Sequence, residues 1–166
     1  MKKLFKMKNF EYLNMTRWQI LSITILRIVI GWHFLYEGLV KVTNPEWSAV
    51  SFLESATGPF ASFFKSIATN SGALEIVNFL NQWGLVLIGL SLMIGLLSRW
   101  ASLGGIVLVA LYYFASPPFI GMNNIPAFEG NYLIVNKNLI EIFALWVLYL
   151  FPSSKVYGID RFFITT

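Results

Sequence analysis

Residues 18–42, WQILSITILRIVIGWHFLYEGLVKV, have the length and apolarity of a membrane-spanning helix but carry Arg27, His33, Glu37 and Lys41. Charged side chains inside a bilayer cost free energy, so they need protein partners or a functional role. On a helix that turns about 100° per residue, Arg27, Glu37 and Lys41 fall within an arc of about 80°, and His33 lies about 40° beyond Glu37. We predict a transmembrane helix whose polar face contacts protein, and this face is the first candidate site.

The composition is that of an integral membrane protein. Of 166 residues, 57% are hydrophobic and 12% are charged, and the mean hydropathy is +0.66. At about 20 residues per span, there is room for four helices but not for a separate soluble catalytic domain. The lack of cysteine excludes disulfides, thiolate metal sites and iron–sulfur clusters bound by this chain, and one histidine is too few for a multi-histidine haem or metal centre. No metal site is predicted, and the modest charge of +4 indicates membrane topology, not nucleic-acid binding.

The predicted fold class is all-α, a membrane four-helix bundle that forms a single domain over residues 1–166. The spans are expected at about 18–41, 79–97, 100–115 and 132–151. The last of these is placed by counting about 20 residues back from Pro152, which stops the helix. Glycines in the second span, at 84, 89 and 95, favour close packing against another helix.

Two segments lie between the spans on one side of the membrane, 43–78 and 116–131. The first has many aromatic residues but is interrupted at Thr57-Gly58-Pro59, which is too broken to span. We expect two short interfacial helices there, capping the bundle, and we read Asn70-Ser71-Gly72 as a loop. The second segment is too apolar for a solvated linker and is expected to fold over the mouth of the bundle.

The basic residues predict the orientation of the chain. Five of them precede the first span and three more lie on the same side, namely Arg99, Lys155 and Arg161. Only three lie on the opposite side, namely Lys41, Lys65 and Lys137. The positive-inside rule then places both termini in the cytoplasm and both intervening segments outside.

Two polar clusters are predicted at the same depth. Arg27 lies about 14 Å along the first span, near the bilayer centre, and Glu141 lies nine residues after Tyr132 on a helix of opposite direction. Arg27 is therefore predicted to pair with Glu141, and Glu37 with the lysine four residues later. The alternative is that these groups only fix the helix register, and that the single histidine is a hydrogen-bonded structural residue instead of a ligand or proton relay.

Three stretches together resemble the DoxX family of small bacterial four-helix membrane proteins. They are LRIVIGWHFLYEGLVKV (26–42), GLLSRWASLGG (95–105) and SSKVYGIDRFF (153–163). The first resembles the family's first helix, in which an arginine precedes a glycine-containing stretch that ends in Gly and Lys. The last resembles the family's closing glycine and Leu-Asp pair, here Gly158 and Asp160 with Ile159 in place of leucine. The match runs over most of residues 20–163, and the segment 43–78 goes beyond the shorter members.

The resemblance implies a multi-pass protein of the bacterial inner membrane. Some family members are associated with thiosulfate:quinone oxidoreductase or other membrane redox complexes, which implies quinone as electron acceptor. A quinone pocket would be apolar with a few polar groups, and its candidate residues are Arg27, Trp32, His33, Asn138 and Glu141. Arg27 and Glu141 would orient the quinone head, and His33 or Glu37 would relay protons.

The second hypothesis is a non-catalytic membrane subunit that docks a membrane or periplasmic partner protein through the external segments 43–78 and 116–131. A small-solute transporter is a third option, although a single four-helix bundle lacks the inverted repeats that alternating access commonly uses.

Overall fold

The computed structural model describes residues 15–118 and 133–163, and the regular elements of this part of the chain are all helices. Its elements are α3 (Arg17–Thr43), α4 (Val50–Glu54), α5 (Ala61–Thr69), α6 (Ser71–Ile94), α7 (Ser98–Ala115), α8 (Lys137–Leu150), the 3₁₀ turn η1 (Ser153–Lys155) and α9 (Asp160–Phe163). The all-α prediction is confirmed for these residues. Most of the predicted loop 116–131 and the basic residues before Arg17 lie outside the described residues.

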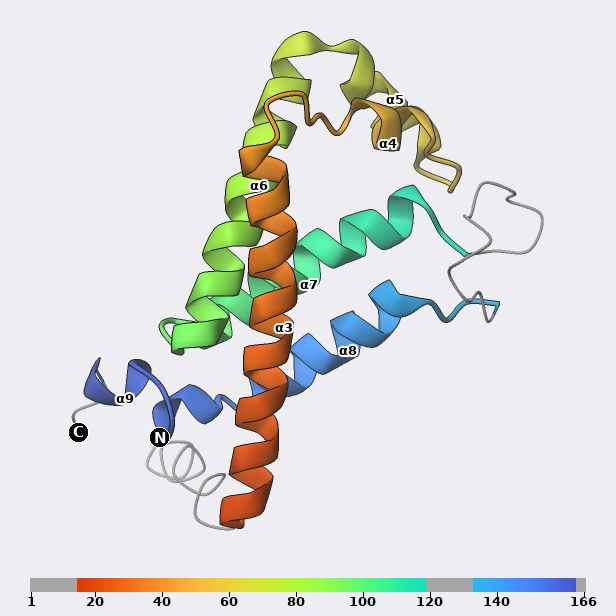
Figure 1. Ribbon diagram of the computed structural model, residues 1–166. Helices are drawn as coiled ribbons and strands as arrows, with labels where there is room; N and C mark the ends of the chain where they lie inside the picture. Colours follow the sequence, from red (N-terminus) through yellow and green to blue (C-terminus); the bar gives the residue numbers. More distant parts are fainter. Residues whose placement is uncertain (1–14, 119–132, 164–166) are drawn as a thin grey trace, which may run out of the picture.

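Three helices, α3, α6 and α7, are long and apolar enough to cross a membrane. Figure 1 shows α3 and α6 side by side and antiparallel, with α7 and α8 inclined to them and with α4 and α5 at the end where α3 finishes. The buried core lies between the two helix pairs and consists of Ile30, Phe34, Leu85, Leu92, Ala101, Val109, Leu145 and Leu148. The four long elements therefore enclose one common interior.

Two predicted boundaries are wrong, and in both cases an asparagine cap decides where the helix begins. α6 begins at Ser71, eight residues before the expected start, because the Asn70 side chain accepts a hydrogen bond from Ala73 N at 3.0 Å. The predicted loop at Asn70-Ser71-Gly72 is thus a helix N-terminus. α8 begins at Lys137 and not at residue 132, because Asn136 caps Leu139 N at 3.0 Å. Counting back from Pro152 assumed a full-length span, whereas α8 has 14 residues.

Glycines allow α3 and α6 to lie in backbone contact. A Cβ atom at Gly38 would lie 2.7 Å from Val86 N, and one at Gly31 would lie 3.0 Å from Gly89 O. Real Cβ atoms do not approach backbone atoms this closely, so larger residues would force the helices apart. With the glycine face against α6, the adjacent polar face of α3 lines the space toward α7 and α8.

The segment between α3 and α6 folds over the end of the bundle where α3 finishes and α6 begins. Two short helices flank the Gly58-Pro59 break, as expected, and their position on the membrane surface stays a prediction. Thr57 N donates to Ala115 O at 3.1 Å, and Ala49 N donates to Asn78 Oδ1 at 2.9 Å. These bonds attach the segment, hereafter the cap (residues 44–69), to α7 and α6.

The C-terminal segment 153–163 is bound to the turn between α6 and α7. Gly95 and Leu97 in this turn have left-handed backbone conformations, with φ of 69° and 51°. Asp160 N donates to Gly95 O at 2.9 Å, and its carboxylate accepts hydrogen bonds from Leu97 N at 2.6 Å, Ser98 N at 3.2 Å and Ser154 Oγ at 2.7 Å. Asp160 therefore serves as the capping carboxylate for α7, whose own preceding residue has no capping side chain.

This capping carboxylate should make stability depend on pH below about pH 4. Burial raises the pKa of Asp160, but hydrogen bonds from Ser154, Leu97 and Ser98 together outweigh it and lower the pKa below its ordinary value of 3.8. A lowered folded-state pKa stabilises the protein above the ordinary value, and this contribution is lost as the pH falls through the folded-state pKa. Unfolding in detergent should show a stability gap between wild type and Asp160→Asn that is constant from about pH 7 to pH 5 and shrinks below about pH 4. A gap that persists unchanged at the lowest pH would contradict the assignment.

Candidate functional site

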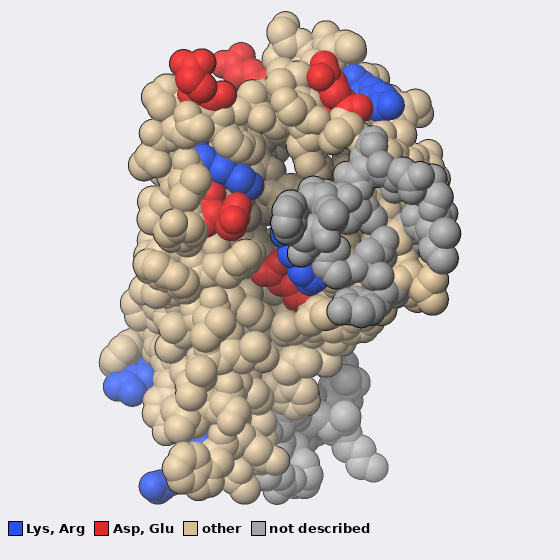
Figure 2. All heavy atoms as spheres, turned by 45° about the vertical axis from the view of Figure 1, so that its right-hand side comes forward, with Lys and Arg blue, Asp and Glu red and all other residues tan. Residues whose placement is uncertain are grey.

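A cavity of about 120 Å³ lies between the helix pairs, toward the end that carries the cap. Phe34, Leu85 and Val109 form its apolar wall. The polar wall consists of His33, Glu37 and Lys41 from α3, Tyr112 from α7, and Lys137, Asn138 and Glu141 from α8. Figure 2 shows acidic and basic side chains next to each other beside a hollow in the middle of this face, with further charged side chains at its upper and lower ends. The cavity is therefore a polar interior site in an apolar bundle.

The α3 side chains enter the cavity because they recur every four residues and so share one face of the helix, beside the glycine contact. His33, Glu37 and Lys41 stack along this face, as the helical spacing predicts. His33 Nε2 lies 3.8 Å from Glu141 Oε1, which joins α3 to α8. Glu37 Oε2 lies 3.9 Å from Lys41 Nζ, so the predicted pairing of these two residues is confirmed.

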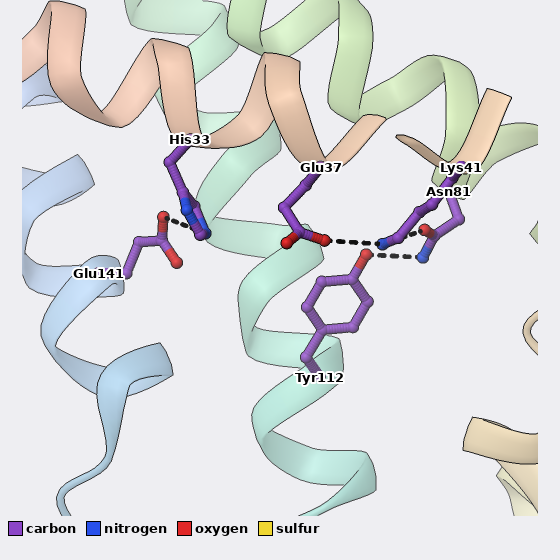
Figure 3. Close-up of polar contacts among 6 residues, drawn as sticks. All are labelled: His33, Glu37, Lys41, Asn81, Tyr112 and Glu141. Carbon is purple, nitrogen blue, oxygen red and sulfur yellow. Dashed lines mark hydrogen bonds and ion pairs between the residues drawn. The ribbon is translucent and has the colours of Figure 1, made fainter. Parts of the chain in front are cut away.

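A hydrogen-bonded chain, which the sequence did not reveal, continues from Lys41 across α6 to α7. Lys41 Nζ donates to Asn81 Oδ1 at 3.1 Å, and Asn81 Nδ2 donates to the Tyr112 hydroxyl at 2.6 Å (Figure 3). Lys41 Nζ also lies 5.2 Å from the ring centroid of Trp47 in the cap. Asn81 could have been found as a polar residue within an apolar span, but Tyr112 gave no such signal because tyrosine is common at membrane interfaces.

Arg27 lies outside the cavity, and its predicted pairing with Glu141 is wrong. Arg27 is 3% exposed, and its guanidinium donates from Nη2 to Tyr157 O of the C-terminal segment at 2.6 Å. The other two guanidinium nitrogens have no acceptor among the described residues. α8 begins five residues later than expected, which moves Glu141 about 7.5 Å toward the start of that helix and away from the level of Arg27. Arg27 thus attaches the C-terminal segment to α3.

Trp32 is also outside the cavity, whereas Asn138 lines it. The Trp32 side chain is 55% exposed on the outer surface of α3, and its ring packs near Tyr36 at a centroid distance of 6.1 Å. Successive helix residues differ by about 100° in direction, so Trp32 points away although His33 points inward. Of the five residues expected to form a pocket, the structure brings together His33, Asn138 and Glu141.

The acidic and basic side chains around the cavity are equal in number. Two carboxylates, Glu37 and Glu141, face two ammonium groups, Lys41 and Lys137, and His33 is the remaining titratable side chain of α3 there. A cavity with this balance favours a neutral polar molecule over a dianion. In the described part of the chain, no three His, Asp or Glu side chains converge closely enough to hold a metal ion. The side chains that line the cavity can form hydrogen bonds and exchange protons.

Comparison with known proteins gives one match. The DoxX family model matches residues 22–116, which is more than half of the chain and extends from α3 through α7. No curated protein and no solved structure matches the chain. The matched range contributes every cavity residue that comes from α3, α6 and α7.

Proposed function

The chain belongs to the DoxX family, and on that premise we propose that it is the membrane subunit of a quinone-linked oxidoreductase, with the quinone head in the cavity. The observation that carries this proposal is the cavity itself, because hydrogen-bonding groups are expensive in a bilayer interior and are retained where they bind something. The apolar wall of Phe34, Leu85 and Val109 suits a ring, and the polar wall suits its oxygen atoms.

In this proposal four helices cross the bacterial inner membrane, with α8 as the fourth. α8 alone is about 21 Å long, so the residues that flank it complete the crossing. Its outward side chains support a lipid environment, since Ile140, Phe143 and Trp146 are all exposed and apolar. The basic residues at the end of the bundle opposite the cap support cytoplasmic termini, and with that orientation the cavity would lie in the outer half of the membrane.

The charge balance of the cavity favours a quinone over a small anion. At about 120 Å³ the cavity is smaller than the roughly 300–1,000 Å³ usual for small-molecule sites, so it would hold little more than the bare quinone ring, and the ring substituents and isoprenoid tail would remain outside it. An anion would meet Glu37 and Glu141 as well as the two lysines. The neutral quinone and quinol avoid that repulsion, because both carry oxygen atoms without net charge.

Reduction of a quinone to a quinol takes two electrons and two protons. The chain has no cysteine and one histidine, so we place the electron donor in a partner subunit. The residues of this chain would supply orientation and protons. His33 is more than half exposed, and its partner Glu141 is 18% exposed, so the pair connects the cavity with its surroundings.

Glu141→Gln should weaken the binding of decylubiquinol by about tenfold, because a charge-assisted hydrogen bond from the quinol hydroxyl to the carboxylate becomes a neutral one. Binding would be measured on purified protein in nanodiscs, with wild type and Glu54→Gln as references. Glu54 is an exposed carboxylate on α4, so Glu54→Gln removes a similar charge far from the cavity and should bind as wild type does.

Mass spectrometry of mildly extracted protein provides an independent test. A co-purified quinone supports the proposal. A preparation without quinone that fails to bind decylubiquinol and instead carries a stoichiometric polypeptide would overturn it in favour of the docking function of the external segments.

A further inference from the structure

The chain Lys41–Asn81–Tyr112 has only one consistent direction of hydrogen bonding. An ammonium group is donor-only, so the group that faces Lys41 Nζ at 3.1 Å must be the oxygen of the Asn81 amide. The amide nitrogen then faces Tyr112, and it donates to the tyrosine oxygen at 2.6 Å. Asn81 is 8% exposed, so water does not offer it an alternative arrangement. Lys41 therefore fixes the Asn81 side chain with its amide oxygen toward Lys41 and its amide nitrogen toward Tyr112.

This direction leaves the Tyr112 hydroxyl hydrogen available. The oxygen already accepts from Asn81, and its hydrogen has no acceptor among the described residues. The ring is held in place by the cap, since Phe52 packs edge-on against it at 5.8 Å, and by Lys41, whose ammonium lies 5.6 Å from the ring centroid. Tyr112 lines the cavity, so the free hydrogen belongs to a fixed donor beside the bound molecule.

We infer that Tyr112 donates a hydrogen bond to one carbonyl oxygen of the bound quinone, and that Lys41 and Asn81 act as positioning residues that impose this direction. The inference rests on the proposed quinone function and deepens it. The two polar ends of the cavity then have different tasks: the Tyr112 end recognises a carbonyl oxygen, and the His33–Glu141 end exchanges a proton with the other oxygen. A molecule with oxygens at opposite edges of a ring satisfies both ends.

The test uses decylubiquinone labelled with ¹³C at its carbonyl groups, bound to the full chain in nanodiscs and observed by infrared difference spectroscopy. In wild type, one carbonyl stretch should shift to lower frequency on binding. Tyr112→Phe should abolish that shift and weaken binding about tenfold, which is the effect of losing one hydrogen bond at a buried site. The matched control is Tyr113→Phe, because the Tyr113 hydroxyl donates to Ile134 O at 2.8 Å and does not line the cavity.

The Asn81→Asp variant changes the direction of the hydrogen bond to Tyr112 while keeping a side chain of nearly the same shape at residue 81. A carboxylate has no hydrogen to donate, so Tyr112 would donate to residue 81 instead of to the quinone, while Lys41 would keep an acceptor. The carbonyl shift should disappear although Tyr112 is intact. A shift that persists in both Tyr112→Phe and Asn81→Asp, with wild type binding the quinone, overturns this inference and leaves the proposed function standing. Absence of binding by the unaltered protein overturns both.

Discussion

Gly89→Val should prevent α3 and α6 from packing and should destabilise the protein by about 3 kcal/mol or more. A Cβ at this position would lie 2.7 Å from Gly31 O and 2.7 Å from Leu35 Cα, both of which are backbone atoms. No side chain can rotate to make room, so the helices must separate along their whole contact. The loss would be measured as the fraction of monodisperse protein after detergent extraction and as the shift in thermal unfolding.

Gly84→Val is the matched control for this prediction. Gly84 lies on the same helix, but a Cβ there would meet nothing within 4 Å. The same substitution should therefore change stability by no more than about 0.5 kcal/mol. If both valine variants lose folded protein equally, the damage comes from the substitution itself and the proposed backbone contact is not responsible.

Asp160→Ala should destabilise the protein by about 3 kcal/mol and release the C-terminal segment. The substitution leaves Leu97 N, Ser98 N and the Ser154 hydroxyl without the carboxylate oxygens that accept from them. Hydrogen bonds to a charged acceptor contribute more than neutral ones, and an uncapped helix start adds to the loss. Thermal unfolding gives the stability change, and the rate of tryptic cleavage after Arg161 reports release of the segment.

Glu54→Ala supplies the comparison for this second prediction. It removes an exposed carboxylate from α4, outside the turn between α6 and α7. Its unfolding temperature and cleavage rate should match those of wild type. Equal cleavage rates in Asp160→Ala and Glu54→Ala would show that Asp160 does not hold the segment in place.

The sequence predicted one face of α3 well because a single helix determines that face. The four-residue spacing of His33, Glu37 and Lys41 requires only helical geometry, and the structure places all three side chains at the cavity. Arg27 lies six residues before His33, about 9 Å along the axis and about 120° away around the helix. Its predicted pairing with Glu141 depended on where α8 begins, and the cap at Asn136 puts that start five residues later than expected.

The remaining parts of the site could not be predicted because they depend on contacts between helices. Asn81 and Tyr112 are 31 residues apart, and nothing in either local sequence indicates that they meet. Gly158 and Asp160 match the family pattern in sequence alone. The capping role of Asp160 depends on the fold, which brings its carboxylate to the start of α7. Tertiary packing determines both the Asn81–Tyr112 hydrogen bond and the Asp160 cap. By contrast, helix geometry alone determines which side chains of α3 share a face.

The cap of α7 also has a consequence for the order of synthesis. Ser98 and the carboxylate that accepts from its amide are 62 residues apart. At the usual speed of translation, roughly 3 to 12 s pass between the appearance of these two residues on the ribosome. During that interval the nascent chain holds α7 with an unsatisfied first turn, so this helix remains open to adjustment until α8 has been made. A segment translated after α8 therefore completes the start of a helix made well before it.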